Sequence, residues 1–407
     1  MADGLAIRSG RVNPVLRKGP PVHKIFIIAC EASGDTHGAS LVHSIKKLDP
    51  AVTFEGLGGM EMERAGVALL EDLTRTSVLG LEDVLRKYFH FRRVFYRALA
   101  HVKKTKPDLV ILIDSPAFNL RFAKKIRGRV PVIYYISPQI WAWGWRRIHT
   151  IRKTVSHMMA ILPFEEEMYR KEDVPCTFVG HPLLDRVKPS KPRAVLRQEF
   201  GLDDRQRMIA LLPGSREPEV RRILPIMLKT ADLLAKEFPE LNFFLTQAPH
   251  VPASLYEENL KRYPELDIKR STVRLYDIVT AADFALVASG TATLETALLG
   301  TPFFLLYKAS ASTFFLGRRL VRIPYIGLVN VLAGRHVVPE FIQHLAKPEK
   351  IAHEAKVLME NAELRENLCR KIREACQKLG EPGASDRAAQ LVVETLREGV
   401  PAGAGLV

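Results

Sequence analysis

Two loops in the second half of the chain combine small residues with a cation, as phosphate-binding loops do. The first follows the apolar stretch 208–212 and contains Gly214, Ser215 and Arg216. Glycine lets the backbone approach a ligand closely, serine can donate a hydrogen bond, and arginine offers a planar cation that matches a phosphate. Taken alone, this loop would also serve as an ordinary turn between a strand and a helix.

The second loop, Ser289-Gly290-Thr291, follows the apolar stretch 284–288 and precedes a helical pattern. Free backbone N–H groups and the positive end of a helix dipole favour a diphosphate there. Glu295 follows one turn later, where its carboxylate can accept hydrogen bonds from both hydroxyls of a ribose. Because the chain lacks a Gly-Lys-Ser/Thr phosphate loop, we expect a nucleoside diphosphate that departs as a leaving group.

Acidic residues mark the corresponding strand ends of the first half. Asp114 ends the apolar run 109–113, and a Ser-Pro pair interrupts the strand there. A carboxylate in apolar surroundings has a raised proton affinity, which suits a general base, although an aspartate that caps a turn has the same pattern. The Gly-containing loop Glu31–Asp35 follows the first strand, so we expect it at the same edge of the sheet.

All three tryptophans of the chain fall in or beside the segment Ser137–Trp143. This segment follows the apolar run 130–136 and precedes Arg146 and Arg147. Aromatic rings beside arginines can form a wall for a sugar or an acyl chain. A core cluster on a buried turn has the same composition, so both interpretations stay open.

The stretch 81–106 carries apolar residues at helical spacing, surrounded by basic residues. This pattern favours a helix that lies on an anionic bilayer, where each basic side chain contributes about 1 kcal/mol. A helix that packs on the core with a solvated basic face has the same pattern. The residues that we expect to meet the membrane are Leu85, Tyr88, Phe91, Arg92, Arg93 and Phe95.

The overall composition limits the classes of function. A formal net charge of +15 favours anionic partners such as nucleic acid, anionic lipid or phosphorylated substrates. The four cysteines lack the spacing of a metal or redox motif, so we expect free thiols. The chain also lacks a clear Asp-x-Asp, which metal-using transferases often place at the diphosphate, so we expect no metal and no cofactor. No apolar run is long enough to span a membrane and no secretory signal is visible, which predicts a cytoplasmic protein that is free in the cytosol or lies against a membrane.

Short apolar runs alternate with helical patterns along the chain, and the alternation restarts after a Pro- and Lys-rich linker at 187–193. Such alternation predicts an α/β fold with parallel sheets, here as two Rossmann-like domains facing across a cleft. The parts that we expect are a disordered basic extension 1–22, an N-terminal domain 23–187, a C-terminal domain 194–350, C-terminal helices 351–397 and a flexible tail 398–407.

Several short motifs occur in a fixed order along the chain. They are EASGD (31–35), GLGG (56–59), IDSPAFN (113–119), SPQIWAW (137–143), LPFE (162–165), FVGHPL (178–183), LLPGSR (211–216), SGTATLE (289–295) and N-x-x-AGR (330–335). In order and spacing the set resembles the lipid-A-disaccharide synthases, membrane-associated glycosyltransferases of the GT-B class. The resemblance covers nearly the whole chain and implies a GT-B fold whose last helices cross back to the N-terminal domain.

The resemblance also implies a reaction and its residues. It implies inverting transfer from UDP-2,3-diacylglucosamine to 2,3-diacylglucosamine 1-phosphate (lipid X) at the inner membrane of a Gram-negative bacterium. Asp114 matches the favoured general base, and Glu31 matches a second acidic position. The UDP-binding positions are Gly214, Ser215, Arg216, Ser289, Gly290, Thr291, Glu295 and Asn330. The acceptor or sugar positions are Ser33, Asp35, Asn119, Ser137, Trp141 and Trp143.

Three positions depart from the family pattern, and two other classes of protein are alternatives to this family. Cys30 stands where a glycine is usual, Gly144 where an arginine is common, and Ala117 where many members carry aspartate. An isomerase similar to UDP-N-acetylglucosamine 2-epimerase would share the UDP loops but would not need SPQIWAW. A nucleic-acid binder would fit the charge, but the chain lacks its signatures, so we expect no nucleic-acid partner. A homodimer through the C-terminal helices is a further possibility.

Overall fold

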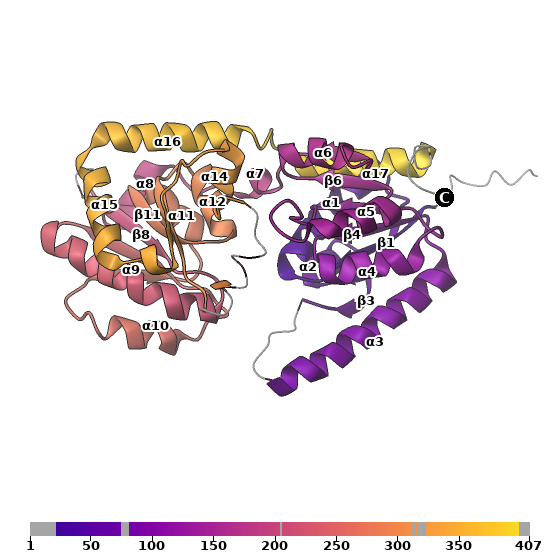
Figure 1. The fold of residues 1–407 in the computed structure, drawn as a ribbon, viewed down its shortest axis with the longest axis horizontal. Helices are drawn as coiled ribbons and strands as arrows, with labels where there is room; N and C mark the ends of the chain where they lie inside the picture. The colour runs from indigo at the N-terminus through magenta and orange to yellow at the C-terminus, as the bar shows by residue number, and fades with distance from the viewer. Residues whose placement is uncertain are drawn as a thin grey trace, which may run out of the picture.

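Two parallel sheets form the framework of the chain in the computed structural model, which describes residues 22–74, 81–203, 206–310, 314, 315, 317, 319 and 323–398. Within these residues, one sheet has seven strands in the order β3-β2-β1-β4-β5-β6-β7, and the other has six in the order β10-β9-β8-β11-β12-β13. The prediction of two Rossmann-like α/β domains is therefore confirmed (Figure 1). The predicted extension and tail fall almost entirely outside the described residues.

The strands of both sheets are short and apolar. Those of the first sheet are β1 (Lys24–Ala29), β2 (Thr53–Gly58), β3 (Ala68–Asp72), β4 (Leu109–Ile113), β5 (Val132–Tyr135), β6 (His157–Ala160) and β7 (Cys176–Phe178). Those of the second are β8 (Met208–Leu212), β9 (Asn242–Thr246), β10 (Ile268–Ser271), β11 (Phe284–Ala288), β12 (Phe303–Tyr307) and β13 (Glu340–Ile342). The central strands β4, β8 and β11 are buried at every residue, because helices cover both faces of each sheet.

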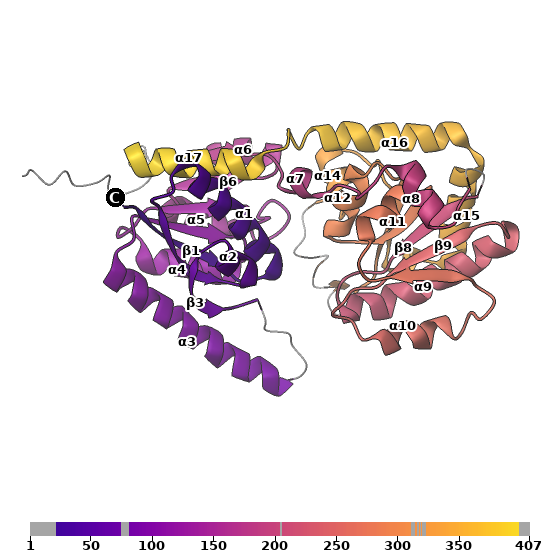
Figure 2. The same ribbon diagram turned by 180° about the vertical axis from the view of Figure 1, so that it is seen from behind.

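Two apolar layers cover the first sheet. One holds α3 (Leu81–Thr105), α4 (Pro116–Ile126) and α5 (Ile148–Thr154) against one face. The other holds α1 (Ala32–Leu48) and α17 (Ala384–Glu398) against the opposite face, where Figure 2 shows the two helices together. The remaining described helices of this domain are α2 (Met60–Arg64), α6 (Pro163–Arg170) and α7 (Leu183–Arg186).

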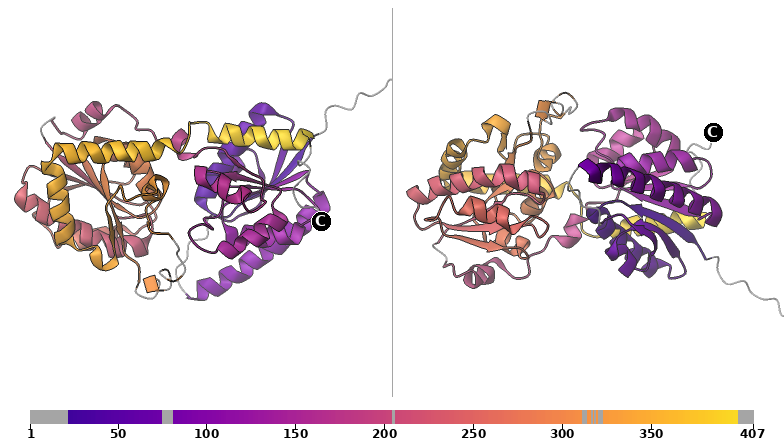
Figure 3. Two further views of the ribbon diagram at one scale, coloured as in Figure 1. Left: turned by 45° about the horizontal axis from the view of Figure 1, so that its top comes forward. Right: turned by 90° about the horizontal axis from the view of Figure 1, so that it is seen from below.

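The C-terminal helices divide between the two domains. We expected all of 351–397 to pack back on the N-terminal domain, and this expectation is wrong for α15 (Pro348–Glu360) and α16 (Ala362–Gln377). Their apolar residues belong to the core of the second domain, with Ile351 and Ile372 fully buried there. Of the described helices in this region, α17 alone crosses back, as Figures 1 and 3 show. The other helices of the second domain are α8 (Arg193–Glu199), α9 (Glu217–Glu237), α10 (Ala253–Leu260), α11 (Leu275–Ala281), α12 (Thr291–Leu298) and α14 (Leu328–Ala333).

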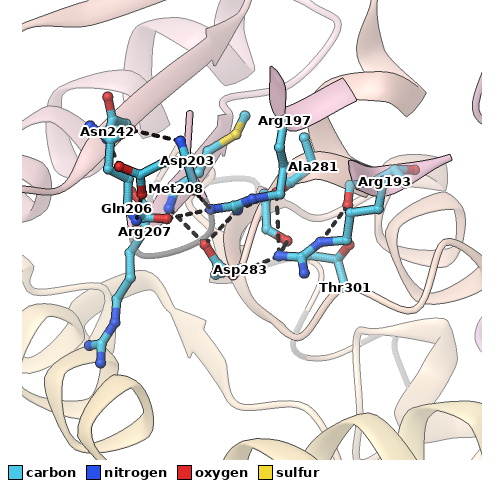
Figure 4. Close-up of polar contacts among 12 residues, drawn as sticks. Arg193, Arg197, Asp203, Gln206, Arg207, Met208, Asn242, Ala281, Asp283 and Thr301 are labelled. Atoms are coloured by element: carbon cyan, nitrogen blue, oxygen red, sulfur yellow. Dashed lines mark hydrogen bonds and ion pairs between the residues drawn. The ribbon is translucent and has the colours of Figure 1, made fainter. Parts of the chain in front are cut away.

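Two arginines that share one partly buried aspartate connect the end of the linker to the second domain. Arg197 of α8 is 5% exposed, and its guanidinium contacts Asp283 Oδ2 at 3.1 Å and the Ala281 carbonyl at 3.1 Å (Figure 4). Arg193 contacts the other carboxylate oxygen of Asp283 at 2.6 Å. A buried guanidinium needs this number of acceptors to offset its desolvation. Asp283 also accepts a hydrogen bond from the amide of Met208, the first residue of β8. These contacts hold the end of the linker at the amino-terminal end of the strands of the second sheet.

Candidate functional site

One pocket of about 390 Å³ gathers most of the residues that the sequence assigned to UDP. It lies at the carboxyl ends of β8, β9, β10 and β11, which is the edge where parallel sheets bind ligands. Seven of the predicted residues line it, namely Gly214, Ser215, Arg216, Ser289, Gly290, Thr291 and Glu295. Sequence reasoning missed five further polar lining residues. Four of them end or follow β9 and β10, namely Thr246, Gln247, Ser271 and Thr272, and the fifth is Glu219 of α9.

The two predicted loops differ in how their helix N-termini are capped. Gly290 precedes α12 and provides no side-chain cap, so the first amides of that helix have no side-chain partner from it. The other helix, α9, is capped by Glu219, whose Oε2 accepts from the amides of Ser215 and Arg216, each at 3.3 Å. Glu219 Oε1 also lies 3.4 Å from the Arg216 guanidinium. One carboxylate thus contacts three of the groups that we expected to meet a diphosphate.

Glycine is required at the first loop for two reasons. Gly214 has φ +116°, and a Cβ atom there would lie 2.8 Å from Glu219 Oε2. Because residues other than glycine rarely adopt this φ, the backbone conformation of the loop depends on Gly214. The glutamate could have been recognised from the sequence, since a glutamate three residues into a helix is part of a capping box.

Glu295 lies on the wall of the pocket, one turn into α12. Its Oε1 accepts a hydrogen bond of 2.8 Å from the hydroxyl of Tyr276. Burial, and then the Glu295 charge, raise the pKa of Tyr276 to about 12, so the phenol keeps its proton as the donor. The tyrosine orients the carboxylate in the pocket.

Asn330 has a structural position instead of a place in the pocket, which contradicts the prediction. It is 1% exposed, and its Nδ2 donates to the Val338 carbonyl and to Glu340 Oε1, both at 2.8 Å. Its Oδ1 accepts from the amides of Val337 and Val338, also at 2.8 Å. These four bonds use the whole amide, so Asn330 joins α14 to the segment that leads into β13.

In the first domain, Asp114 follows β4 at the carboxyl edge of the sheet. Burial, and to a lesser degree the charge of Glu31, raise the pKa of Asp114, while a hydrogen bond from the Ser115 amide lowers it. Asp114 is half-buried, whereas Glu31, before α1, is exposed. The structure therefore brings the two predicted acidic residues within electrostatic range of each other.

The other predicted residues of the EASGD loop separate into two groups. Ser33 is exposed. Asp35 is 4% exposed, and its carboxylate accepts from the amides of Gly59, Glu61 and Met62 at 2.8 to 3.1 Å. Asp35 therefore caps α2, and the expectation that it contacts the acceptor is wrong because both of its oxygens are engaged inside the protein.

The tryptophan segment is tied to a buried carboxylate. Glu165 is 1% exposed, and its Oε1 accepts from the Ser137 hydroxyl at 2.7 Å and from the Trp141 indole at 3.0 Å. Burial raises the pKa of Glu165 to about 7. Ser137 and Trp141 thus anchor the segment, whereas Trp143 is 43% exposed and lies beneath the Arg147 guanidinium, 4.2 Å from its ring centroid.

Helix α3 presents different aromatic residues to solvent from those we predicted. Phe91 and Phe95 are half-buried and pack edge-on against Phe118 of α4, so their rings face the core of the domain, which contradicts the expectation that they meet a membrane. The side chains of Leu85 and Tyr88 lie outside the described residues. Arg92 and Arg93 are exposed, together with two aromatic residues that we had not selected, Phe89 and Tyr96.

The described residues contain neither a membrane-spanning helix nor a metal-binding cluster. No described helix is long and apolar enough to cross a bilayer. In the same part of the chain, no group of three or more His, Cys, Asp and Glu side chains is arranged to hold a metal ion.

Comparison with solved structures identifies the same architecture. A UDP-N-acetylglucosamine 2-epimerase from Neisseria meningitidis bound to UDP-GlcNAc has a TM-score of 0.58 at 13% identity, covering 92% of this chain and 100% of that one. MurG from Acinetobacter baumannii has a TM-score of 0.55 at 16% identity, with the same coverage of both chains. At these identities the similarity establishes the fold alone.

Sequence comparison identifies the family. Residues 25–394 match the family model described as lipid-A-disaccharide synthetase. The chain is 43% identical over 375 residues to the lipid-A-disaccharide synthase of Syntrophus aciditrophicus, covering 92% of this chain and 98% of that protein. It is 40% identical over 378 residues to the enzyme of Geobacter sulfurreducens, covering 92% and 97%. The chain therefore belongs to the lipid-A-disaccharide synthetase family, the glycosyltransferases that form the disaccharide of lipid A.

Proposed function

We propose that the protein joins UDP-2,3-diacylglucosamine to 2,3-diacylglucosamine 1-phosphate with inversion at the anomeric carbon. The products are the β-1,6-linked lipid A disaccharide 1-phosphate and UDP. The observation that carries the proposal is the single pocket that gathers both Gly-containing loops and Glu295 in a member of this family. The proposed step uses protein side chains and backbone dipoles only.

The donor half of the proposal uses the pocket of the second domain. The diphosphate lies between the Ser215 loop and the N-terminus of α12, where Arg216 and the helix dipole oppose its charge. As the sugar–phosphate bond breaks, negative charge grows on the diphosphate, so these groups stabilise the transition state more than the ground state. Glu295, oriented by Tyr276, accepts from the ribose hydroxyls.

The acceptor half uses Asp114 as general base. Its carboxylate takes the proton of the acceptor 6-hydroxyl, and that oxygen forms a bond to the anomeric carbon of the donor. The bond from this carbon to the diphosphate breaks, and UDP departs with the electron pair. Burial raises the pKa of Asp114, and this supports the role because a stronger base accepts the proton more readily.

A third part of the proposal concerns membrane binding and uses the solvent-exposed face of α3. Phe89, Arg92, Arg93 and Tyr96 are spaced to share one face, and the two aromatic residues are 61% and 54% exposed. Aromatic rings flanked by arginines suit the boundary between anionic headgroups and acyl chains. We propose that this face attaches the protein peripherally to the cytoplasmic side of the inner membrane, where both lipid substrates reside. The homodimer that we expected from the C-terminal helices stays a prediction.

Product analysis by mass spectrometry tests the proposed reaction. Purified protein is incubated in mixed micelles with UDP-2,3-diacylglucosamine and 2,3-diacylglucosamine 1-phosphate. We expect a tetraacyl disaccharide 1-phosphate and one equivalent of UDP. UDP release from UDP-N-acetylglucosamine without any disaccharide would contradict the proposal and favour the isomerase alternative.

Sedimentation with vesicles tests the membrane face. Reversing Arg92 and Arg93 to glutamate should weaken binding to vesicles that contain phosphatidylglycerol by at least tenfold, since each basic side chain contributes about 1 kcal/mol. The matched control reverses Arg370 and Arg373, which are exposed on α16 of the other domain. Equal losses for both pairs would show a nonspecific charge effect and remove the assignment to α3.

A further inference from the structure

We propose that Tyr134 and Asn119 are positioning residues that hold the backbone of Asp114 in a left-handed conformation and so direct its carboxylate. The inference rests on the proposed role of Asp114 as general base. Asn119 was expected to touch the acceptor, but its side chain is fully buried and points to the backbone below the site.

The backbone at the end of β4 is strained. Asp114 has φ +46° and Ser115 has φ +43°, so two consecutive residues other than glycine occupy the left-handed region. Side chains with a Cβ atom rarely adopt this region, and such strain persists only where the surrounding structure holds it. The strained pair lies directly at the proposed base and immediately before α4.

Two buried side chains hold this strained turn. The Nδ2 atom of Asn119 donates to the carbonyls of Ile113 at 2.9 Å and Asp114 at 2.8 Å. The hydroxyl of Tyr134 donates to the same Asp114 carbonyl. Both side chains are fully buried, so solvent does not replace these donors easily.

At Asp114 the backbone is held by hydrogen bonds, and the side chain is left to act as the proposed base. The amide of Asp114 donates to the Tyr135 carbonyl at 3.1 Å, and its carbonyl receives the two buried donors, so both of its peptide groups are fixed. The side chain of this half-buried residue then leaves the strand end in a single direction. Without the donors, the peptide can relax to an ordinary conformation and carry the carboxylate away from the position at which it meets the acceptor hydroxyl.

The experiment removes one hydroxyl and measures the reaction in its parts. Tyr134→Phe keeps the ring and deletes the donor, whereas the control Tyr135→Phe alters the next residue, whose ring lies on the opposite face with α17. In mixed micelles with both proposed substrates, Tyr134→Phe should lower kcat about tenfold, as expected for the loss of a buried hydrogen bond. The donor KM and the affinity for UDP should stay within about twofold of wild type, because the donor pocket is built by the other domain.

Asn119→Ala is the second variant, with the same expected pattern and a larger loss of kcat, since it deletes two donors. Retention of wild-type kcat in Tyr134→Phe and Asn119→Ala, with only a lower melting temperature, would overturn the inference and leave both residues with a structural role. Should one variant fail to fold, the other decides by the same criterion. Asp114→Asn in the same assay separates the two proposals: full activity there refutes the base itself, not its support.

Discussion

The two domains use their polar residues in different ways. In the C-terminal domain, the residues chosen for their chemistry line the pocket themselves, with the exception of Asn330, because a loop such as Gly214–Arg216 offers its backbone and side chains directly. In the N-terminal domain, Asp35, Asn119 and Ser137 are buried and hold the loops that carry the accessible groups. A polar residue in a functional motif therefore either contacts the ligand or holds the loop that does. The exposed fraction of its side chain distinguishes the two roles.

Asp114→Asn should have the largest effect and tests the N-terminal side of this comparison. Removal of a general base lowers kcat by about 10²- to 10⁴-fold. Affinity for UDP should not change, because Asp114 does not line the donor pocket. Initial rates together with calorimetric titration of UDP measure both quantities, and a near-normal rate would remove Asp114 from the base role.

Arg216→Ala should have the next largest effect and tests the C-terminal side. Loss of a hydrogen bond to a charged group costs about 1.5–3 kcal/mol, which corresponds to about a ten- to hundredfold weaker affinity for UDP. The matched control is Arg221→Ala, also near the start of α9, whose guanidinium pairs with Glu217 at 2.6 Å. A similar loss in both variants would indicate damage to the helix and not to the pocket.

Glu165→Gln tests whether the support of the tryptophan segment depends on pH. Burial raises the pKa of Glu165 to about 7 from an ordinary value of 4.5, so the folded protein binds this proton more tightly than the unfolded chain. The resulting stabilisation is complete below pH 4.5 and is lost as the pH rises through about 7. The melting temperature of the wild type should therefore fall between pH 5 and 8 more than that of the variant; parallel curves would contradict the assignment.

Glu219→Gln should have the smallest effect and sharpens the comparison between the two helix N-termini of the pocket. UDP must displace this carboxylate from the amides of Ser215 and Arg216, whereas the N-cap residue of α12, Gly290, has no side chain to displace. Because a partly exposed charge contact contributes about 0.5–1 kcal/mol, we expect the variant to bind UDP about two- to fivefold more tightly. Glu217→Gln is the control, and weaker binding by Glu219→Gln would show that the carboxylate assists the nucleotide.

How far the sequence predicts the site depends on where each residue finds its partners. The donor loops were predictable because strand ends and glycines locate them within a few residues. Asn330 was not, since its role depends on bonds to residues 337–340, which no local pattern reveals.

The packing of α3 and of the C-terminal helices also could not be predicted from local patterns. The periodicity of α3 reveals apolar stripes but not which stripe meets α4, so Phe91 and Phe95 were taken for the outer face. The helical pattern of 351–397 likewise does not show that the chain crosses between domains after α16.

A crystal structure of the protein with UDP tests the central claim most directly. The account predicts UDP in the pocket of the second domain, with its diphosphate between the Ser215 loop and the N-terminus of α12. The ribose hydroxyls should meet Glu295, and the Glu219 carboxylate should have moved away from the Ser215 and Arg216 amides. UDP bound in the first domain, or in the second domain without contact to either loop, would contradict the account.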